Sequence, residues 1–201
     1  PFKPYVFERG NPYRRGEPVP RRLPAILALG PRQPFQHRSG RLELARAITA
    51  PQNPLTARVL VNRVWLHHFG EGLVRTPGDF GTRGTPPTHP ELLDYLAHWF
   101  VHDANWSLKA LHRLLMTSAA YRQSSQHRPV ADEADPANRL LWRMRRRRLD
   151  FESMRDSHLY LADSLDRTIG GRPLPIFSST SLQPRRSIYG FVDRMNPAPL
   201  L

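Results

Sequence analysis

Proline is the residue that most restricts how this chain can fold. Twenty-one of the 201 residues are proline, about twice the usual share of ~5%. Each proline fixes φ at about −65° and lacks a backbone N–H, so it interrupts regular hydrogen bonding. The sequence therefore predicts many short elements joined by rigid turns.

The distribution of residue types predicts three parts. Residues 1–40 are rich in proline, arginine and glycine, which indicates an extended arm with a short strand at Tyr5–Glu8. Residues 41–170 carry apolar residues at helical spacing and are expected to form the helical core domain. Residues 171–201 are expected to form a loop and a strand, Ile188–Val192, at the truncated start of a further C-terminal part. Both ends suggest a piece of a longer protein.

Two helices are predicted at the start of the core domain. The first follows Ser39 as its cap and ends before Pro51. The second begins after Asn53 as N-cap, with a proline in its first turn, and ends at Gly70.

Further helices are predicted downstream. One begins with the capping-box spacing of Thr88 and Glu91, and the next follows Ser107 as its cap. Another covers much of 135–166, is broken or bent near a run of arginines, and ends before Gly170. The predicted fold class is thus mainly α: an irregular multi-helix domain with long Pro/Gly-rich loops and one or two short strands near the termini.

The charge of the chain points to an anionic partner only in part. The net charge is +13 and the pI is about 11.3, values typical of proteins that bind nucleic acid or acidic polymers. However, Lys3 and Lys109 are the only lysines, whereas phosphate-binding surfaces commonly use both cations. This bias argues against nucleic acid as the partner.

The composition also excludes several kinds of site within this chain. Cysteine is absent, which excludes disulfides, thiolate metal sites, cysteine nucleophiles and a CxxCH haem attachment. No stretch approaches the ~20 apolar residues of a transmembrane helix, so no membrane segment is expected. The glycine-rich segment 78–84 lacks the Gly-Lys-Ser/Thr ending of a phosphate-binding loop.

The predicted second helix carries polar residues although it is apolar almost all round. Such a helix is usually central to a core, and its polar side chains then need hydrogen-bond partners. In one interpretation they hydrogen-bond the backbone of loop 71–87 or stabilise the end of the helix. In the other, a histidine of this helix joins a downstream carboxylate and a further histidine around a metal ion or a substrate. The candidate polar site consists of Asn62, Arg63, His67, His68, Asp79 and His89.

Spacing favours the framework interpretation over metal chemistry. Adjacent residues of a helix diverge by about 100°, so His67 and His68 cannot easily share one ion. The HExxH arrangement is absent as well, so no metal site is established by the sequence.

The run Arg145, Arg146, Arg147 and Arg148 is the best candidate for contact with an anion. On a helix these side chains would point in all directions, so one or two of them would face any one partner. Solvated arginines, or arginines paired with nearby carboxylates, are the simpler alternative.

Four long segments closely resemble the planctomycete PSD-type domain, domain of unknown function 1553. They are NPLTARVLVNRVWLHHFGEGLVRTPGDFG, PPTHPELLDYLAHWF, WSLKALHRLLMTSAAYRQSS and DPANRLLWRMRRRRLDFESMRDS, in this order within 41–166. The resemblance implies a large exported (periplasmic or extracellular) protein that often joins this domain to a cytochrome c module, a companion domain and sometimes a carbohydrate-binding-like domain. Haem c would then belong to the attached domains, and no cofactor is expected in this chain.

No activity is established for domains of this family, so the resemblance assigns no catalytic residue. It implies other domains of the same polypeptide, and polysaccharide, as partners. Our leading hypothesis is an accessory module with a binding or structural role. The alternatives are a metal-dependent hydrolytic or redox enzyme acting on polysaccharide, and a module that binds nucleic acid or sulfated glycan through its arginines.

Overall fold

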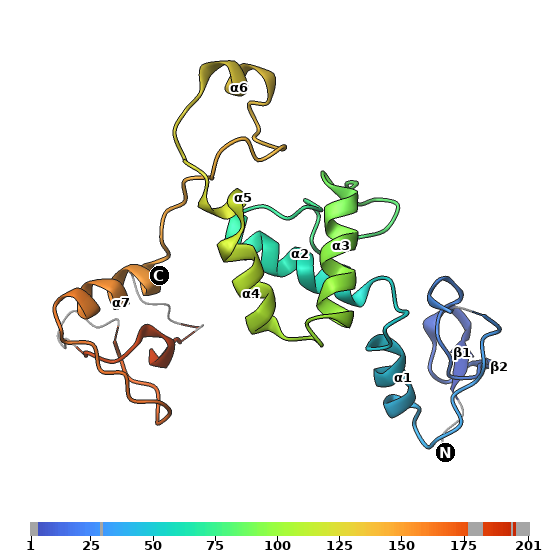
Figure 1. Ribbon diagram of the computed structural model, residues 1–201. Coiled ribbons are helices and arrows are strands. Elements are labelled where there is room, and N and C mark those ends of the chain that lie inside the picture. The colour runs from blue at the N-terminus through green and yellow to red at the C-terminus, as the bar shows by residue number, and fades with distance from the viewer. Residues whose placement is uncertain (1–3, 29, 177–182, 194, 196–201) are drawn as a thin grey trace. The chain divides into compact units, whose positions relative to one another are not determined.

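The computed structural model describes residues 4–28, 30–176, 183–193 and 195. The described part contains seven α-helices and one two-stranded sheet, which confirms the mainly α prediction (Figure 1). Contacts within the chain divide it into two compact units, Pro1–Arg145 and Arg146–Leu201. The predicted three-part division, with boundaries at 40 and 170, stays a prediction.

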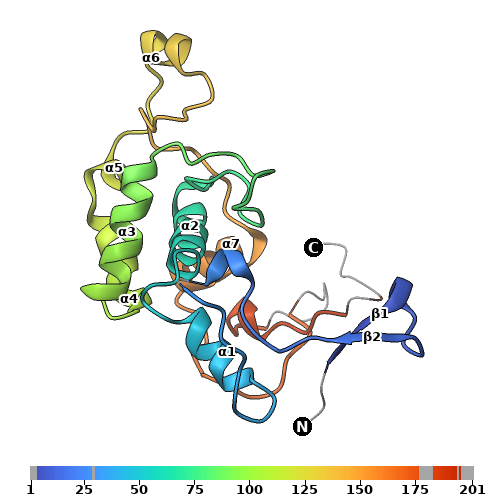
Figure 2. The same cartoon turned by 90° about the vertical axis from the view of Figure 1, so that its right-hand side faces the viewer.

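The N-terminal segment forms a short hairpin. Strand β1 (Tyr5–Phe7) pairs antiparallel with β2 (Arg15–Pro18), and the two strands run side by side in Figure 2. The short strand predicted near residue 5 is therefore confirmed. Two 3₁₀ turns, Glu8–Gly10 and Ala25–Leu27, account for much of the remaining local structure.

Helix α1 (Arg41–Ile48) begins differently from the prediction. Its N-cap is Gly40 with a φ of 73°, and a Cβ at this position would lie 2.7 Å from the Phe35 ring. Only glycine adopts this conformation so close to a ring without strain. The predicted Ser39 cap is wrong, and no side chain caps α1. Glu43 instead ties the preceding segment to the helix by accepting from the backbone N–H groups of residues 36 and 37.

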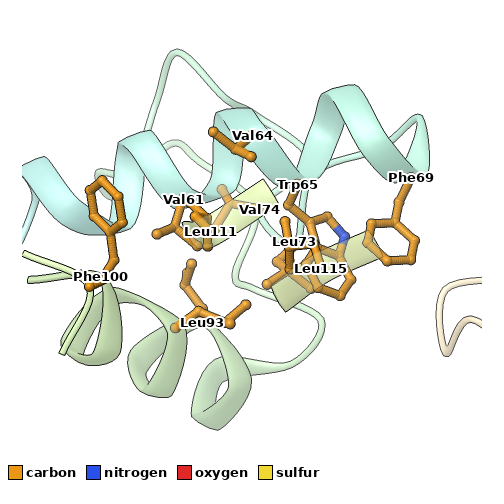
Figure 3. Close-up of a cluster of buried hydrophobic side chains, with 12 residues drawn as sticks. Val61, Val64, Trp65, Phe69, Leu73, Val74, Leu93, Phe100, Leu111 and Leu115 are labelled. Carbon is orange, nitrogen blue, oxygen red and sulfur yellow. The ribbon is translucent and has the colours of Figure 1, made fainter. Parts of the chain in front are cut away.

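Three helices enclose the core of the first unit. They are α2 (Thr56–Phe69), α3 (Pro90–His102) and α4 (Leu108–Thr117), and α2 contacts both of the others. Figure 3 shows the side chains that meet between them. Among the most buried are Val61, Trp65, Phe69, Leu73, Val74, Leu93, Leu96, Phe100, Leu111 and Leu115. Burial of one such side chain contributes about 1.5–3 kcal/mol, so this cluster dominates the stability of the unit.

The ends of α2 agree in part with the prediction. Gly70 closes the helix with a φ of 87°, as glycine does at helix C-termini. Asn53 accepts hydrogen bonds from the backbone N–H groups of Leu55 and Thr56, although the helix itself begins only at Thr56.

Of the caps predicted for α3 and α4, only the one at α4 is confirmed. The capping box predicted at α3 is wrong. His89 is the N-cap and makes no side-chain capping bond, and the Thr88 hydroxyl donates to the Leu73 carbonyl. At α4 the prediction is confirmed, since Ser107 Oγ accepts from the backbone N–H of Ala110.

The long helix predicted over much of 135–166 is largely wrong. Two short helices, α5 (Ala119–Arg122) and α6 (Pro129–Ala134), precede an irregular segment that runs to residue 150. In this segment Asn138 has a φ of 49° and bonds the backbone N–H and C=O of Arg143. Local side-chain bonds of this kind compete with helical bonding.

The second unit is built on one helix, α7 (Phe151–Leu161), which Asp150 caps by accepting from the backbone N–H of Ser153. The strand predicted at Ile188–Val192 is wrong, because residues 187–189 form a 3₁₀ turn and only Gly190 makes a bridge, to Leu174. Among the residues described, no helix has the length and apolar character needed to cross a membrane.

Candidate functional site

Asn62 lies at the centre of α2 and is fully buried (0% exposed). Its Nδ2 donates to the Val74 carbonyl at 3.0 Å, and its Oδ1 accepts from the Val74 N–H at 2.8 Å. One side chain therefore satisfies both backbone groups of a buried residue twelve positions downstream. This is the framework role, because it fixes the chain that leaves α2.

Gly72 is required by the same arrangement. A Cβ on Gly72 would lie 2.5 Å from the Val74 carbonyl oxygen and 2.8 Å from the Asn62 amide atoms. These distances are too short for real contacts, so a larger residue would displace the chain from Asn62.

The glycine-rich loop beyond Val74 is held by its own polar groups. Asp79 Oδ1 accepts from the Gly81 N–H, and the Thr76 hydroxyl donates to the Asp79 carbonyl while accepting from the Thr85 N–H. A Cβ on Gly84 would lie 2.2 Å from the Asp79 carbonyl oxygen. Asp79 thus has the structural role of bracing a turn.

The histidines of the predicted site lie in different surroundings. His68 Nε2 lies 2.7 Å from His112 Nδ1 on α4, so one of these nitrogens donates to the other. The His68 ring also meets the Tyr121 ring edge to face. His89 Nδ1 lies 2.9 Å from the hydroxyl of its neighbour Thr88.

The remaining members of the predicted site, Arg63 and His67, are exposed. In the described ranges no three His, Asp or Glu side chains are arranged to hold a metal ion. The metal or substrate site built from these six residues stays a prediction.

Arg145 joins the irregular segment to the end of α2. Glu71 Oε2 accepts from both Arg75, at 2.6 Å, and Arg145, at 2.9 Å. Arg145 also donates to the carbonyls of Ala137 and Asn138. The space beside this network measures only about 10 Å³, room for about one water molecule, so it is a closed structural contact.

The other three arginines of the run, 146–148, are exposed and lie outside any helix. The helical premise of the anion-binding hypothesis is therefore wrong, although anion binding by the run itself stays a prediction.

A hollow in the second unit is lined by residues of α7 and the segment that follows it, and we call it the α7 hollow. Its volume is about 680 Å³, within the range of small-ligand sites. Its apolar wall includes Tyr160, Leu161 and Ile169, which are 58%, 80% and 90% exposed. The charged lining residues are Asp156, Arg167 and Arg186.

The polar side of the α7 hollow is rigidly built. Asp156 Oδ1 accepts from the Ser187 N–H at 2.8 Å and from its hydroxyl at 2.7 Å. Arg155 donates to the Arg185 carbonyl at 2.9 Å and to the Gln183 carbonyl. These bonds join α7 to a segment about thirty residues further along the chain.

Two arginines, Arg167 and Arg186, line the α7 hollow. The Arg167 guanidinium lies 5.1 Å from the centre of the Tyr160 ring, which is cation–π distance. Arg186 Nε lies 3.8 Å from Asp156 Oδ2, and its side chain is 55% exposed. Sequence patterns do not reveal this group of residues, because no short motif connects residues 156, 167 and 186.

The carboxyl groups with shifted pKa values all stay ionised at neutral pH in the described part of the chain. The side-chain and backbone hydrogen bonds of Thr168 lower the pKa of Asp166, and the Leu140 N–H lowers the pKa of Asp135. The Arg58 side chain likewise lowers the pKa of Asp94. Such groups serve as fixed acceptors and negative charges.

A family model described as PSD1, protein of unknown function (DUF1553), matches residues 40–201. No curated protein and no solved structure gives a significant match.

Proposed function

The chain belongs to the PSD1 family of proteins of unknown function (DUF1553), and we propose that it is a non-catalytic module that binds acidic polysaccharide for a longer protein. The observation that carries this proposal is the α7 hollow, whose wall combines exposed apolar side chains with two arginines. In the longer protein, the other domains of the same exported polypeptide would act on or respond to the bound chain.

The apolar wall suits the faces of sugar rings. The C–H faces of a sugar are apolar, and an exposed tyrosine offers a flat, rigid surface with a polar hydroxyl at its edge. Tyr160 is held by the guanidinium of Arg167 over its ring, so little conformational freedom is lost when a ligand arrives. Leu161 and Ile169 extend this surface.

The two arginines favour an acidic sugar over a neutral one. A guanidinium pairs with a carboxylate or sulfate through two parallel N–H···O bonds. Arg186 lies at the edge of the hollow, and its side chain remains 55% exposed despite its distance of 3.8 Å from Asp156. Its donors can therefore reach a ligand.

Two of the groups predicted for the opposite, catalytic interpretation have hydrogen-bond partners in the framework. Asn62 is bound to Val74, and Asp79 braces its own turn. These bonds support a module that presents a rigid surface.

Calorimetric titration of the full chain with a short oligogalacturonate, and with a neutral oligosaccharide of the same length, tests the proposal. We expect binding of the acidic sugar only. Tyr160→Ala should weaken it by about 3- to 10-fold, the value of an aromatic contact of about 0.5–1.5 kcal/mol. Tyr95→Ala is the matched control, because Tyr95 has the same exposure of 58% but lies on α3.

Arg186→Met should abolish the preference for the acidic sugar. Equal affinity for both sugars, equal losses in the Tyr95 and Tyr160 variants, or no binding by the unaltered chain would each refute the proposal.

A further inference from the structure

The last two turns of α3 bring two histidines together, His98 and His102. Residues four apart on a helix are neighbours on its surface, and these two rings have centroids 4.3 Å apart with planes tilted by 32°. Both side chains are exposed, and the recorded contact of each ring within the described residues is with the other ring. We call them the α3 histidine pair.

The α3 histidine pair lines an open hollow of about 250 Å³. Residues 51–54, which precede α2, form one side of this hollow, and Arg58 and Asp94 lie in its wall. Asp94 Oδ1 accepts from Arg58 Nε at 2.6 Å, so this carboxylate is already neutralised. The two imidazoles therefore line the hollow beside a carboxylate that already has an ionic partner.

We propose that His98 and His102 bind a divalent late first-row transition ion, with Cu²⁺ held most tightly. Neutral imidazole suits Cu²⁺, Ni²⁺ and Zn²⁺, and Cu²⁺ stands at the top of the usual affinity order. Bonds from imidazole nitrogen to such ions are about 2.0–2.1 Å long, so two rings this close can each turn one nitrogen towards a single ion.

The site is open. No third His, Asp or Glu of the described residues is arranged around the pair, so water or an added ligand fills the remaining positions of the ion. Every residue involved lies in the first unit, whereas the α7 hollow lies in the second. The inference therefore does not depend on the proposed function.

The other pair of histidines is a worse candidate. His68 Nε2 and His112 Nδ1 already share a hydrogen bond at 2.7 Å, which an ion would have to break. In the α3 pair no such bond between the rings has to be broken. The two pairs thus make opposite predictions for the same experiment.

The test is titration of the full chain with Cu²⁺ alone, measured by equilibrium dialysis and by electron paramagnetic resonance. We expect one tightly bound ion with nitrogen couplings from two imidazoles. His98→Ala and His102→Ala should each weaken binding by about tenfold or more, because even the loss of an outer partner of a metal ligand costs about 10- to 100-fold in affinity.

A double variant, His102→Ala with Asp103→His, keeps the number of histidines but places them five residues apart. It should bind as weakly as His102→Ala, because the two rings then diverge by about 140°. His112→Ala should bind Cu²⁺ like the unaltered chain. Tryptophan fluorescence checks that each variant folds, since all four tryptophans lie in the first unit.

Three results would overturn the inference. They are the absence of a tight ion in the unaltered chain, equal affinity in the double variant and the unaltered chain, and a loss of the ion on substitution of His112 in place of His98.

Discussion

Helices α2 and α7 place their polar side chains in opposite environments. α2 has six buried residues, and its Asn62 is fully enclosed with both partners supplied by Val74. α7 has one buried residue, Leu159, and its Asp156 stands half-buried at the edge of a hollow. A polar group that is enclosed can only stabilise the fold, whereas one at the edge of a hollow can also orient a ligand.

Polar residues on an apolar helix are thus weak indicators of a reaction site. The cluster on α2 drew attention in the sequence because its surroundings are apolar. The same apolar surroundings bury Asn62 and keep ligands away from it. The exposed tyrosine of α7 and the arginines near it form no recognisable sequence motif, but in the structure they line the same hollow.

The largest effect is expected from the core of the first unit. Phe100→Ala should lower the free energy of unfolding of this unit by about 3–5 kcal/mol, because Phe100 is 0% exposed and its loss leaves a cavity. Denaturant unfolding followed by tryptophan fluorescence measures it. Leu159→Ala serves as the counterpart in α7, and an equal shift of the fluorescence transition would show that the two units do not unfold separately.

Removal of the enclosed amide is expected to cost somewhat less. Asn62→Ala leaves the Val74 N–H and C=O without their partner and should destabilise the first unit by about 2–4 kcal/mol. The Val74 amide should also exchange its hydrogen faster. Asn11→Ala is the control, because Asn11 accepts a bond from Tyr13 in an exposed turn. A loss in Asn62→Ala no larger than in this control would contradict the clamp.

The hydrogen bonds of Asp156 on α7 are expected to contribute less to the free energy of unfolding, and to stabilise only the second unit. Asp156→Ala removes the acceptor of the Ser187 N–H and hydroxyl, which should cost about 1–3 kcal/mol in the second unit. Faster hydrogen exchange at Ser187, with unchanged tryptophan fluorescence, is the expected readout. Asp193→Ala, which removes an exposed turn bond to Met195, should change neither.

The smallest effect concerns the surface pair between α2 and α3. Arg58→Met should cost less than about 1 kcal/mol at pH 7, because the Asp94 side chain is 57% exposed. The Arg58 bond lowers the pKa of Asp94 in the folded state. Its contribution is therefore complete above the unfolded pKa of about 3.9 and disappears as the pH falls through the folded pKa. Thermal unfolding between neutral and acidic pH measures this, and a difference that grew in acid would contradict the assigned sign.

The predictions that held depend on neighbouring residues. Gly70 ends α2 and Ser107 caps α4, because a left-handed glycine and a capping hydroxyl act within one turn of the helix. The four-residue spacing of His98 and His102 is equally local and can be read from the sequence.

The predictions that failed had competing partners far along the chain. Thr88 could have capped α3, yet its hydroxyl bonds Leu73 fifteen residues earlier. The arginine run could have continued a helix, yet Arg145 pairs with Glu71, which lies 74 residues away. Local propensity does not predict these hydrogen-bond partners, because they depend on which segments the core brings together.

By itself, the sequence determined the mainly α class, the position of α2 between proline and glycine, and the absence of thiol chemistry. Periodicity, proline geometry and composition act without reference to the rest of the chain. The tertiary structure decided that Asn62 binds both backbone groups of Val74, and that Asp156 in the lining of the α7 hollow binds Ser187, 31 residues away. The role of a polar side chain depends on these distant partners. Water competes for its hydrogen bonds until packing excludes the water.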